Sequence, residues 1–163
     1  MKAERLAILL FFSLFFGETR AQSTAPEQAP NIVPNPGFET FISQPIGWYY
    51  KGAHFGEVVK YWQSATTASP DAYSPKVRVP ESWQEKGFGK FKPHTGKNMA
   101  GITVYGCKNG KPHCREYIEI LLAEPLVVGQ SYLVEFWVAS LPKSLQINQL
   151  GAIFTLAKIE KKT

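Results

Sequence analysis

Two apolar runs in the second half of the chain alternate with period 2, which is typical of strands whose successive side chains face opposite sides of a sheet. In residues 132–139 both faces are apolar apart from Glu135, as in a central strand, and Trp137 is expected in the core. Residues 117–122 have one apolar and one mixed face. Pro125 and Gly129 lie between the runs and favour a chain reversal. The pattern predicts an antiparallel pair at the centre of the fold.

Further strands are predicted before and after this pair. They cover residues 31–39, where the prolines indicate an edge, and residues 46–50, 58–64, 98–106 and 150–159. No stretch after the amino terminus shows a sustained 3.6-residue apolar stripe, so the expected fold class is all-β and antiparallel. The irregular spacing of the strands favours a jelly-roll β-sandwich. About seven strands are predicted, which is one or two fewer than that fold has. We therefore expect a sandwich over residues 31–163 that is incomplete at its carboxy end, within a longer product.

The intervening residues 65–97 predict no regular structure. They are rich in Pro, Gly, Ser and Lys and show little periodicity. An irregular segment of this length in a compact domain is usually a functional or elaborated loop.

The first residues have the pattern of an export signal. Lys2 and Arg5 precede an apolar run from Leu6 to Phe16, which only Ser13 interrupts, and Thr19 and Ala21 are small residues at the positions that a signal peptidase reads. The run suits a secretory signal peptide over residues 1–21, and a membrane anchor helix is the alternative. Residues 22–30 are small, polar and Pro-rich, as in a disordered lead-in. We expect an exported protein, secreted or associated with the cell surface.

Charge and cysteine content add two alternatives. The formal charge of +5 is mild, and the basic residues between Lys76 and Lys97 suit either a solvated loop or attraction to acidic polysaccharide. Nucleic acid is not an expected partner of an exported chain. Cys107 and Cys114 bracket an Asn-Gly turn, which indicates a disulfide across a short loop. A metal site that also uses His113 is the alternative, although its spacing fits no common zinc pattern.

Several motifs in their order resemble a known family. They include NIVPNPGFE at 31–39, HTGKNMAGI at 94–102 and REYIEILLAEPLVVGQSYLVEFWVAS at 115–140. The chain resembles the amino-terminal domain of exported and outer-membrane Bacteroidetes proteins, some of which carry an OmpA-like domain. That domain is similar to galactose-binding-like jelly rolls, among them carbohydrate-binding modules of the CBM4/9 kind. The resemblance implies a structural calcium near the Gly-Phe-Glu motif, with Glu39 as a candidate ligand, while a solvent-facing acid at a strand end is the alternative reading of Glu39.

A sugar-binding module needs flat aromatic faces on which pyranose rings stack, with polar groups beside them. Trp83 and Tyr73 lie in the long loop, where no pattern requires burial, whereas core packing is the favoured interpretation of Trp48 and Trp62. The candidate carbohydrate-binding residues are Tyr73, Trp83, Trp62, Trp48, Tyr105 and Arg115.

The case for catalysis is poor. None of the three histidines has the spacing of a metal pair, and no serine lies in a nucleophile-elbow context. Glu116 and Glu135 could support glycoside hydrolysis, but any two acids on strands meet that description. The sequence favours a non-catalytic module that binds a glycan. A structural or adhesive domain of an outer-membrane or cell-envelope protein is the alternative.

Overall fold

The computed structural model describes residues 30–47, 52–105 and 115–159. The chain divides into two units, Met1–Pro30 and Asn31–Thr163, and the fold belongs to the second. Four sequence predictions lie wholly or mostly outside the described residues: the signal peptide with its lead-in, the strand at 46–50, the candidate Trp48, and the pairing of Cys107 with Cys114.

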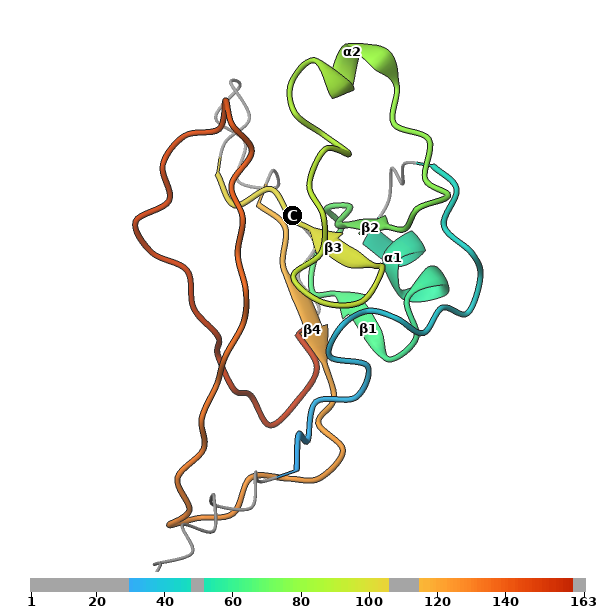
Figure 1. The fold of residues 1–163 in the computed structure, drawn as a ribbon. Coiled ribbons are helices and arrows are strands. Elements are labelled where there is room, and N and C mark those ends of the chain that lie inside the picture. Colours follow the sequence, from blue (N-terminus) through green and yellow to red (C-terminus); the bar gives the residue numbers. More distant parts are fainter. Residues whose placement is uncertain (1–29, 48–51, 106–114, 160–163) are drawn as a thin grey trace, which may run out of the picture. The chain divides into compact units, whose positions relative to one another are not determined.

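The described residues form two small antiparallel sheets and two short helices. The elements in chain order are α1 (Gly52–Val58), β1 (Trp62–Ser64), β2 (Asp71–Tyr73), α2 (Glu81–Gln84), β3 (Met99–Gly101) and β4 (Ile118–Ile120), shown in Figure 1. Strand β1 pairs with β4, and β2 pairs with β3. The prediction of a β-rich fold with antiparallel pairing is thus confirmed, whereas the predicted absence of helices is wrong.

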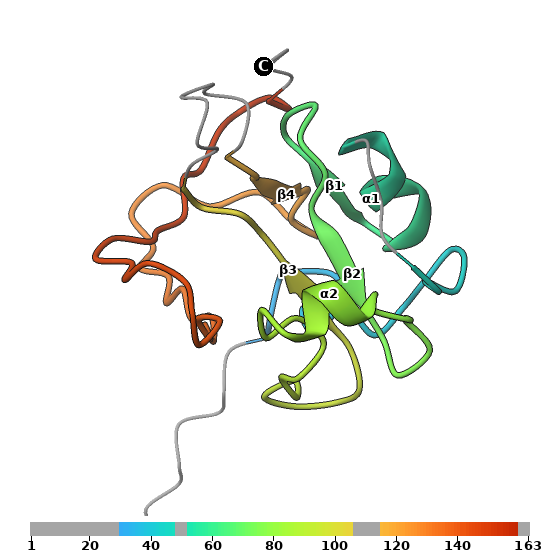
Figure 2. The same ribbon diagram turned by 90° about the horizontal axis from the view of Figure 1, so that it is seen from above.

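Helix α1 supplies most of the core. Phe55, Val58 and Val59 are buried, and their spacing of three and four residues places them on one side of a helical turn. They contact Ala72 of β2, and α1 lies beside β1 and β2 in both Figure 1 and Figure 2. Residues 58–64 were predicted as one strand, but only Trp62–Ser64 is extended, because the helix ends at Val58 and a turn follows. The apolar signal for α1 spans little more than one turn, too short to register as a stripe.

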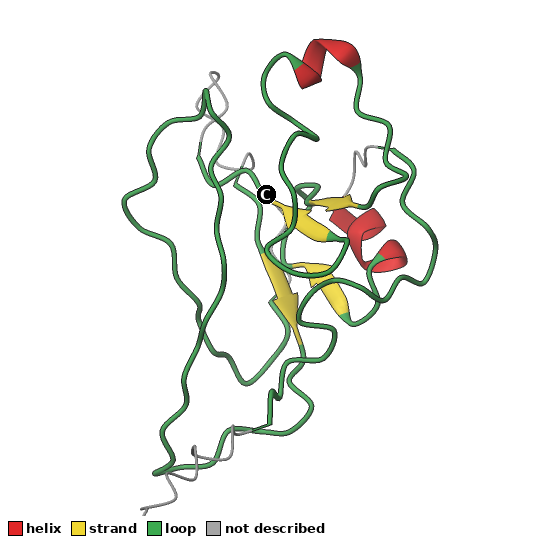
Figure 3. Cartoon of the chain, viewed as in Figure 1, coloured by secondary structure: helices red, strands yellow, loops and turns green. Residues whose placement is uncertain are grey.

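The predicted central strand at residues 132–139 is not formed. No residue there is in a strand or helix, and Figure 3 shows the chain after β4 as loop throughout its described part. Leu133 is 83% exposed and Trp137, predicted in the core, is 76% exposed and stacks on His94 with 3.7 Å between ring centroids. A strand with apolar side chains on both faces needs a layer on each side. In the described residues the buried apolar side chains are instead gathered around α1.

The turn predicted between the two runs is present without the strand pair. Gly129 has φ +85° and the amide of Gln130 donates to the carbonyl of Val127 at 3.2 Å, as expected for a chain reversal. The first run forms β4, but β4 pairs with β1 rather than with residues 132–139. Predicted strands at 31–39 and 150–159 are also absent, while β3 confirms part of the strand predicted at 98–106.

A turn at Asn35 replaces the predicted edge strand and joins three segments. Asn35 has φ +50°, and its side-chain amide donates to the carbonyls of Thr40 at 3.0 Å and Lys60 at 2.9 Å. Its carbonyl oxygen Oδ1 accepts from the amide of Thr40 at 2.9 Å, and its main-chain carbonyl accepts from the indole N–H of Trp62 at 2.9 Å. Phe38 lies in the same turn, and the centroid of its ring is 4.9 Å from that of the Trp62 ring. The side chain of Asn35 therefore holds the turn against the start of β1.

Replacing Asn35 by alanine should destabilise the fold by about 2–4 kcal/mol, because three hydrogen bonds are lost and alanine disfavours a positive φ. Asn35→Gly should cost less than Asn35→Ala, since glycine accepts this backbone conformation. Urea unfolding followed by tryptophan fluorescence measures both, and Asn31→Ala, which removes one exposed turn contact, is the matched control. Equal stabilities of the Asn31 and Asn35 variants would contradict the central role of Asn35.

Candidate functional site

The β2–β3 pair places polar side chains on the face opposite the core. Ala72 is buried against α1, and Asp71 and Tyr73 flank it, so alternation directs both to the other face. In the register of the pair, Asp71 lies opposite Gly101. A Cβ atom on Gly101 would lie 2.8 Å from Cε2 of Tyr73, which means that the glycine makes room for the Tyr73 ring.

Glu116 joins this face from the residues just before β4. Its amide donates to the carbonyl of Thr103 at 2.8 Å, and the amide of Thr103 donates to Glu116 Oε2 at 2.6 Å. The hydroxyl of Thr103 and the amide of Ser69 also donate to the carboxylate. Burial raises the pKa of Glu116, and these donors oppose the rise. The hydrogen bonds between Thr103 and Glu116 thus position a second carboxyl group near Asp71.

Asp71 is the proton-bearing member of the resulting pair. Burial, followed by the charge of Glu116, raises the pKa of Asp71 from 3.8 to about 8. Glu116 is the better position for the negative charge because N–H and O–H groups point at it. Burial and the two carboxyl groups also raise the pKa of Tyr73 above its ordinary range, so its phenol keeps its proton. At neutral pH the face offers hydrogen-bond donors and acceptors side by side.

Tyr105 and Arg115 lie in the same two segments as Thr103 and Glu116, two residues after Thr103 and one residue before Glu116. Tyr105 is 67% exposed, and the guanidinium carbon of Arg115 lies 5.8 Å from its ring centroid. That separation is within the range of a cation–π contact and holds the two side chains together at the surface. We call the set Asp71, Tyr73, Tyr105, Arg115 and Glu116 the acid-pair site.

Three of the six candidates from the sequence belong to the acid-pair site: Tyr73 lies near the two carboxyl groups, and Tyr105 lies against Arg115. Trp62 does not join them: it is half-buried, with its indole N–H bonded to Asn35 and its ring against Phe38. Trp83 lies in α2, where its ring contacts Phe88 at 5.0 Å and Lys86 lies 4.8 Å above it.

The pairing of Asp71 with Glu116 was not foreseen. The sequence offers Glu116 only together with Glu135, as one of many possible pairs of acids on strands. Strand β2 lies within the stretch predicted as irregular, so nothing in the sequence signalled that Asp71 would face Glu116.

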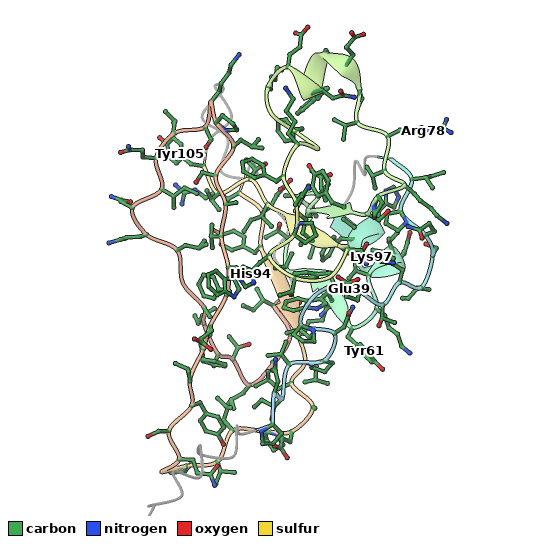
Figure 4. The ribbon with its side chains drawn as sticks, in the orientation of Figure 1. Glu39, Tyr61, Arg78, His94, Lys97 and Tyr105 are labelled. Carbon is green, nitrogen blue, oxygen red and sulfur yellow. The ribbon has the colours of Figure 1, made fainter. Side chains whose placement is uncertain are left out.

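Glu39 is engaged in a different way from a calcium ligand. Its Oε1 accepts from the amides of Lys97 at 2.8 Å and Asn98 at 3.0 Å, and its Oε2 accepts from the side-chain amide of Asn98 at 2.7 Å. Gly96, at φ +70°, brings the loop so close that a Cβ atom there would clash with Oε1. Figure 4 shows Glu39 and Lys97 next to each other. Three N–H groups pointing at the carboxylate would repel a cation.

Calcium requires six or more oxygen ligands. Within residues 30–47, 52–105 and 115–159, no three His, Cys, Asp or Glu side chains are grouped so as to hold a metal ion. The residues at Glu39 therefore do not fit the structural calcium implied by the resemblance. Glu39 instead closes the loop before β3.

The chain matches no protein-family model, no curated protein and no solved structure. Among the described residues, no helix is long and apolar enough to cross a membrane.

The raised pKa of Asp71 can be measured directly, because Asp71 is the only aspartate in the chain. In protein labelled with ¹³C at the aspartate carboxyl, a single resonance should titrate near pH 8 instead of near pH 4. Glu116→Gln should move that midpoint downward, since it removes the neighbouring charge. A midpoint near 4 in the unmodified protein would contradict the proposed pair.

The same shift sets the direction of the pH dependence of stability. Between about pH 4 and pH 8 the unfolded chain has lost the Asp71 proton and the folded protein keeps it, so unfolding becomes easier as the pH rises. We expect a loss of about 1–2 kcal/mol over this range, allowing for solvent screening of a partly exposed group. Thermal melts should show this slope in the unmodified protein and a flatter one in Asp71→Asn.

Glu39 offers a test of its structural role. Glu39→Ala should destabilise the fold by about 1–3 kcal/mol, because three donors lose a charged acceptor. Addition of calcium or a chelator should leave the melting temperature of the unmodified protein unchanged. A rise in melting temperature with calcium that Glu39→Ala abolishes would restore the metal interpretation.

Proposed function

We propose that this protein is a non-catalytic, exported β-sandwich module of the galactose-binding-like kind, and that it binds carbohydrate at the acid-pair site. The observation that carries the proposal is the exposed ring of Tyr105 against Arg115, in the same two segments that join Thr103 to Glu116, the acidic neighbour of a protonated Asp71. An aromatic face suits the apolar side of a pyranose, and closely spaced donors and acceptors suit vicinal hydroxyls. Antiparallel pairing of both strand pairs is consistent with the sandwich.

The acid pair supports binding better than hydrolysis. Hydrolysis of a glycosidic bond requires one carboxylate that acts as nucleophile or base. The oxygens of Glu116 already accept hydrogen bonds from Thr103 and Ser69, and these bonds oppose the rise in its pKa that burial causes. The pair is thus placed to orient hydroxyl groups rather than to attack a sugar carbon.

Tyr105→Ala should weaken glycan binding about tenfold or more, because the stacking surface is removed. A glycan array identifies the ligand, and calorimetric titration measures the dissociation constant. Trp83→Ala is the control: it removes another exposed aromatic, which lies in α2, and it should bind like the unmodified protein. Equal loss in both variants would place the binding elsewhere.

A second function, a structural or adhesive domain of the cell envelope, is favoured by one observation. Large apolar side chains between Leu121 and Leu156 are exposed, including Leu133 and Trp137. Exposed apolar surface of this extent commonly marks contact with another protein. The second function would be favoured over the first by two results together. The protein would bind no glycan on the array, and it would self-associate or bind the cell envelope in a way that Leu133→Lys removes.

A further inference from the structure

An open depression of about 430 Å³ lies between α1 and β1 and is separate from the acid-pair site. It is lined by Gly56 and Glu57 of α1, by Tyr61, by Gln63 of β1, and by Lys158. Its volume falls within the range of sites for small ligands. In Figure 4 Tyr61 and Tyr105 lie well apart, so the two aromatics do not belong to one surface. We call this depression the α1–β1 depression.

Glu119 fixes the polar wall of the depression. Its Oε1 accepts from the side-chain amide of Gln63 at 2.9 Å, and its Oε2 accepts from the amide of Ile159 at 3.0 Å. One carboxylate therefore holds both the Gln63 side chain and the residue that follows Lys158. Side chains positioned in this way require little further ordering when a ligand binds.

Tyr61 is the feature that needs an explanation. It has φ +75°, a conformation that is strained for a residue other than glycine. Its side chain is 56% exposed and is absent from the core, and Lys60 Nζ lies 5.0 Å from its ring centroid. Glycine would satisfy this turn without strain. An aromatic at such a position is best explained by use of its side chain, and the ring borders the depression.

We propose that the α1–β1 depression is a second ligand site, which binds one residue of a neutral sugar chain by stacking it on Tyr61. The lining contains one acid, Glu57, and one base, Lys158, so no strong preference for an anion or a cation arises. The amide of Gln63 and these two charged groups match hydroxyls that both donate and accept hydrogen bonds. The inference rests on the proposed function only for the class of ligand.

The test is a titration of the ¹⁵N-labelled protein with neutral gluco-, manno- and galacto-oligosaccharides and with a uronic acid oligomer. Binding in the depression should shift the side-chain amide of Gln63 and the indole N–H of Trp62. Tyr61→Gly should weaken this binding about tenfold while the melting temperature stays equal or rises, because the backbone strain is relieved. Tyr61→Phe should keep the binding. A structural role for Tyr61 predicts the reverse, namely lower stability in Tyr61→Gly.

The outcomes for the two sites can be told apart. Shifts at Gln63 that persist in Tyr105→Ala and disappear in Tyr61→Gly would support the second site, whatever happens at the acid-pair site. Shifts confined to Tyr73, Tyr105 and Arg115 would overturn the second site and leave the proposed function intact. Preference for the uronic acid oligomer would overturn the neutral ligand class, and the absence of any shift would overturn both proposals.

Discussion

The turn from Asn35 to Glu39 is the constraint on which the rest of the fold depends. Asn35 binds the carbonyl of Lys60 before β1, and Glu39 binds the amides before β3, so one short turn fixes the starts of strands from both sheets. Such a connection matters more when the core is small, as it is around Phe55. A few hydrogen bonds then make up a large fraction of a stability that is marginal in any protein. The strained φ of Asn35 is offset by the three bonds that its side chain makes.

The parts of the fold that the sequence predicted are those governed by local chemistry. Gly129 adopts positive φ because only a residue without Cβ does so freely, and Ile118–Ile120 is extended because its alternation is sharp. The pairing of β4 with β1 is a different matter. Alternation predicts that a segment is a strand in a sheet, but it does not predict which other strand pairs with it. Residues 132–139 had the stronger strand pattern, yet a run that is apolar on both faces depends on layers that the local sequence does not describe.

In the candidate site, too, the residue types could be predicted from the sequence, whereas their arrangement in space could not. Tyr73, Tyr105 and Arg115 could be chosen by residue type, because aromatic and guanidinium groups bind sugars wherever they are exposed. Their convergence could not be predicted, since it depends on the register of β2 with β3 and on the contact of Thr103 with Glu116. Trp62 shows the reverse case: its type suits a ligand site, but a bond from its indole to Asn35 commits the ring to the core.

Strand β4 connects the two proposed sites through a single register. Gln63 lies opposite Glu119 in the pair with β1, and their side chains are also hydrogen-bonded, so the register is fixed by side chains as well as by backbone. Ile118 meanwhile packs on the core, and Glu116 lies two residues earlier. A slip by one residue would turn Glu119 toward the core and Ile118 away from it. The same slip would separate Glu119 from Gln63 and Glu116 from Thr103. A carboxylate buried in the core would be strongly destabilising. The apolar-polar-apolar pattern of Ile118–Ile120 therefore fixes the register of β4, and with it the geometry of both sites.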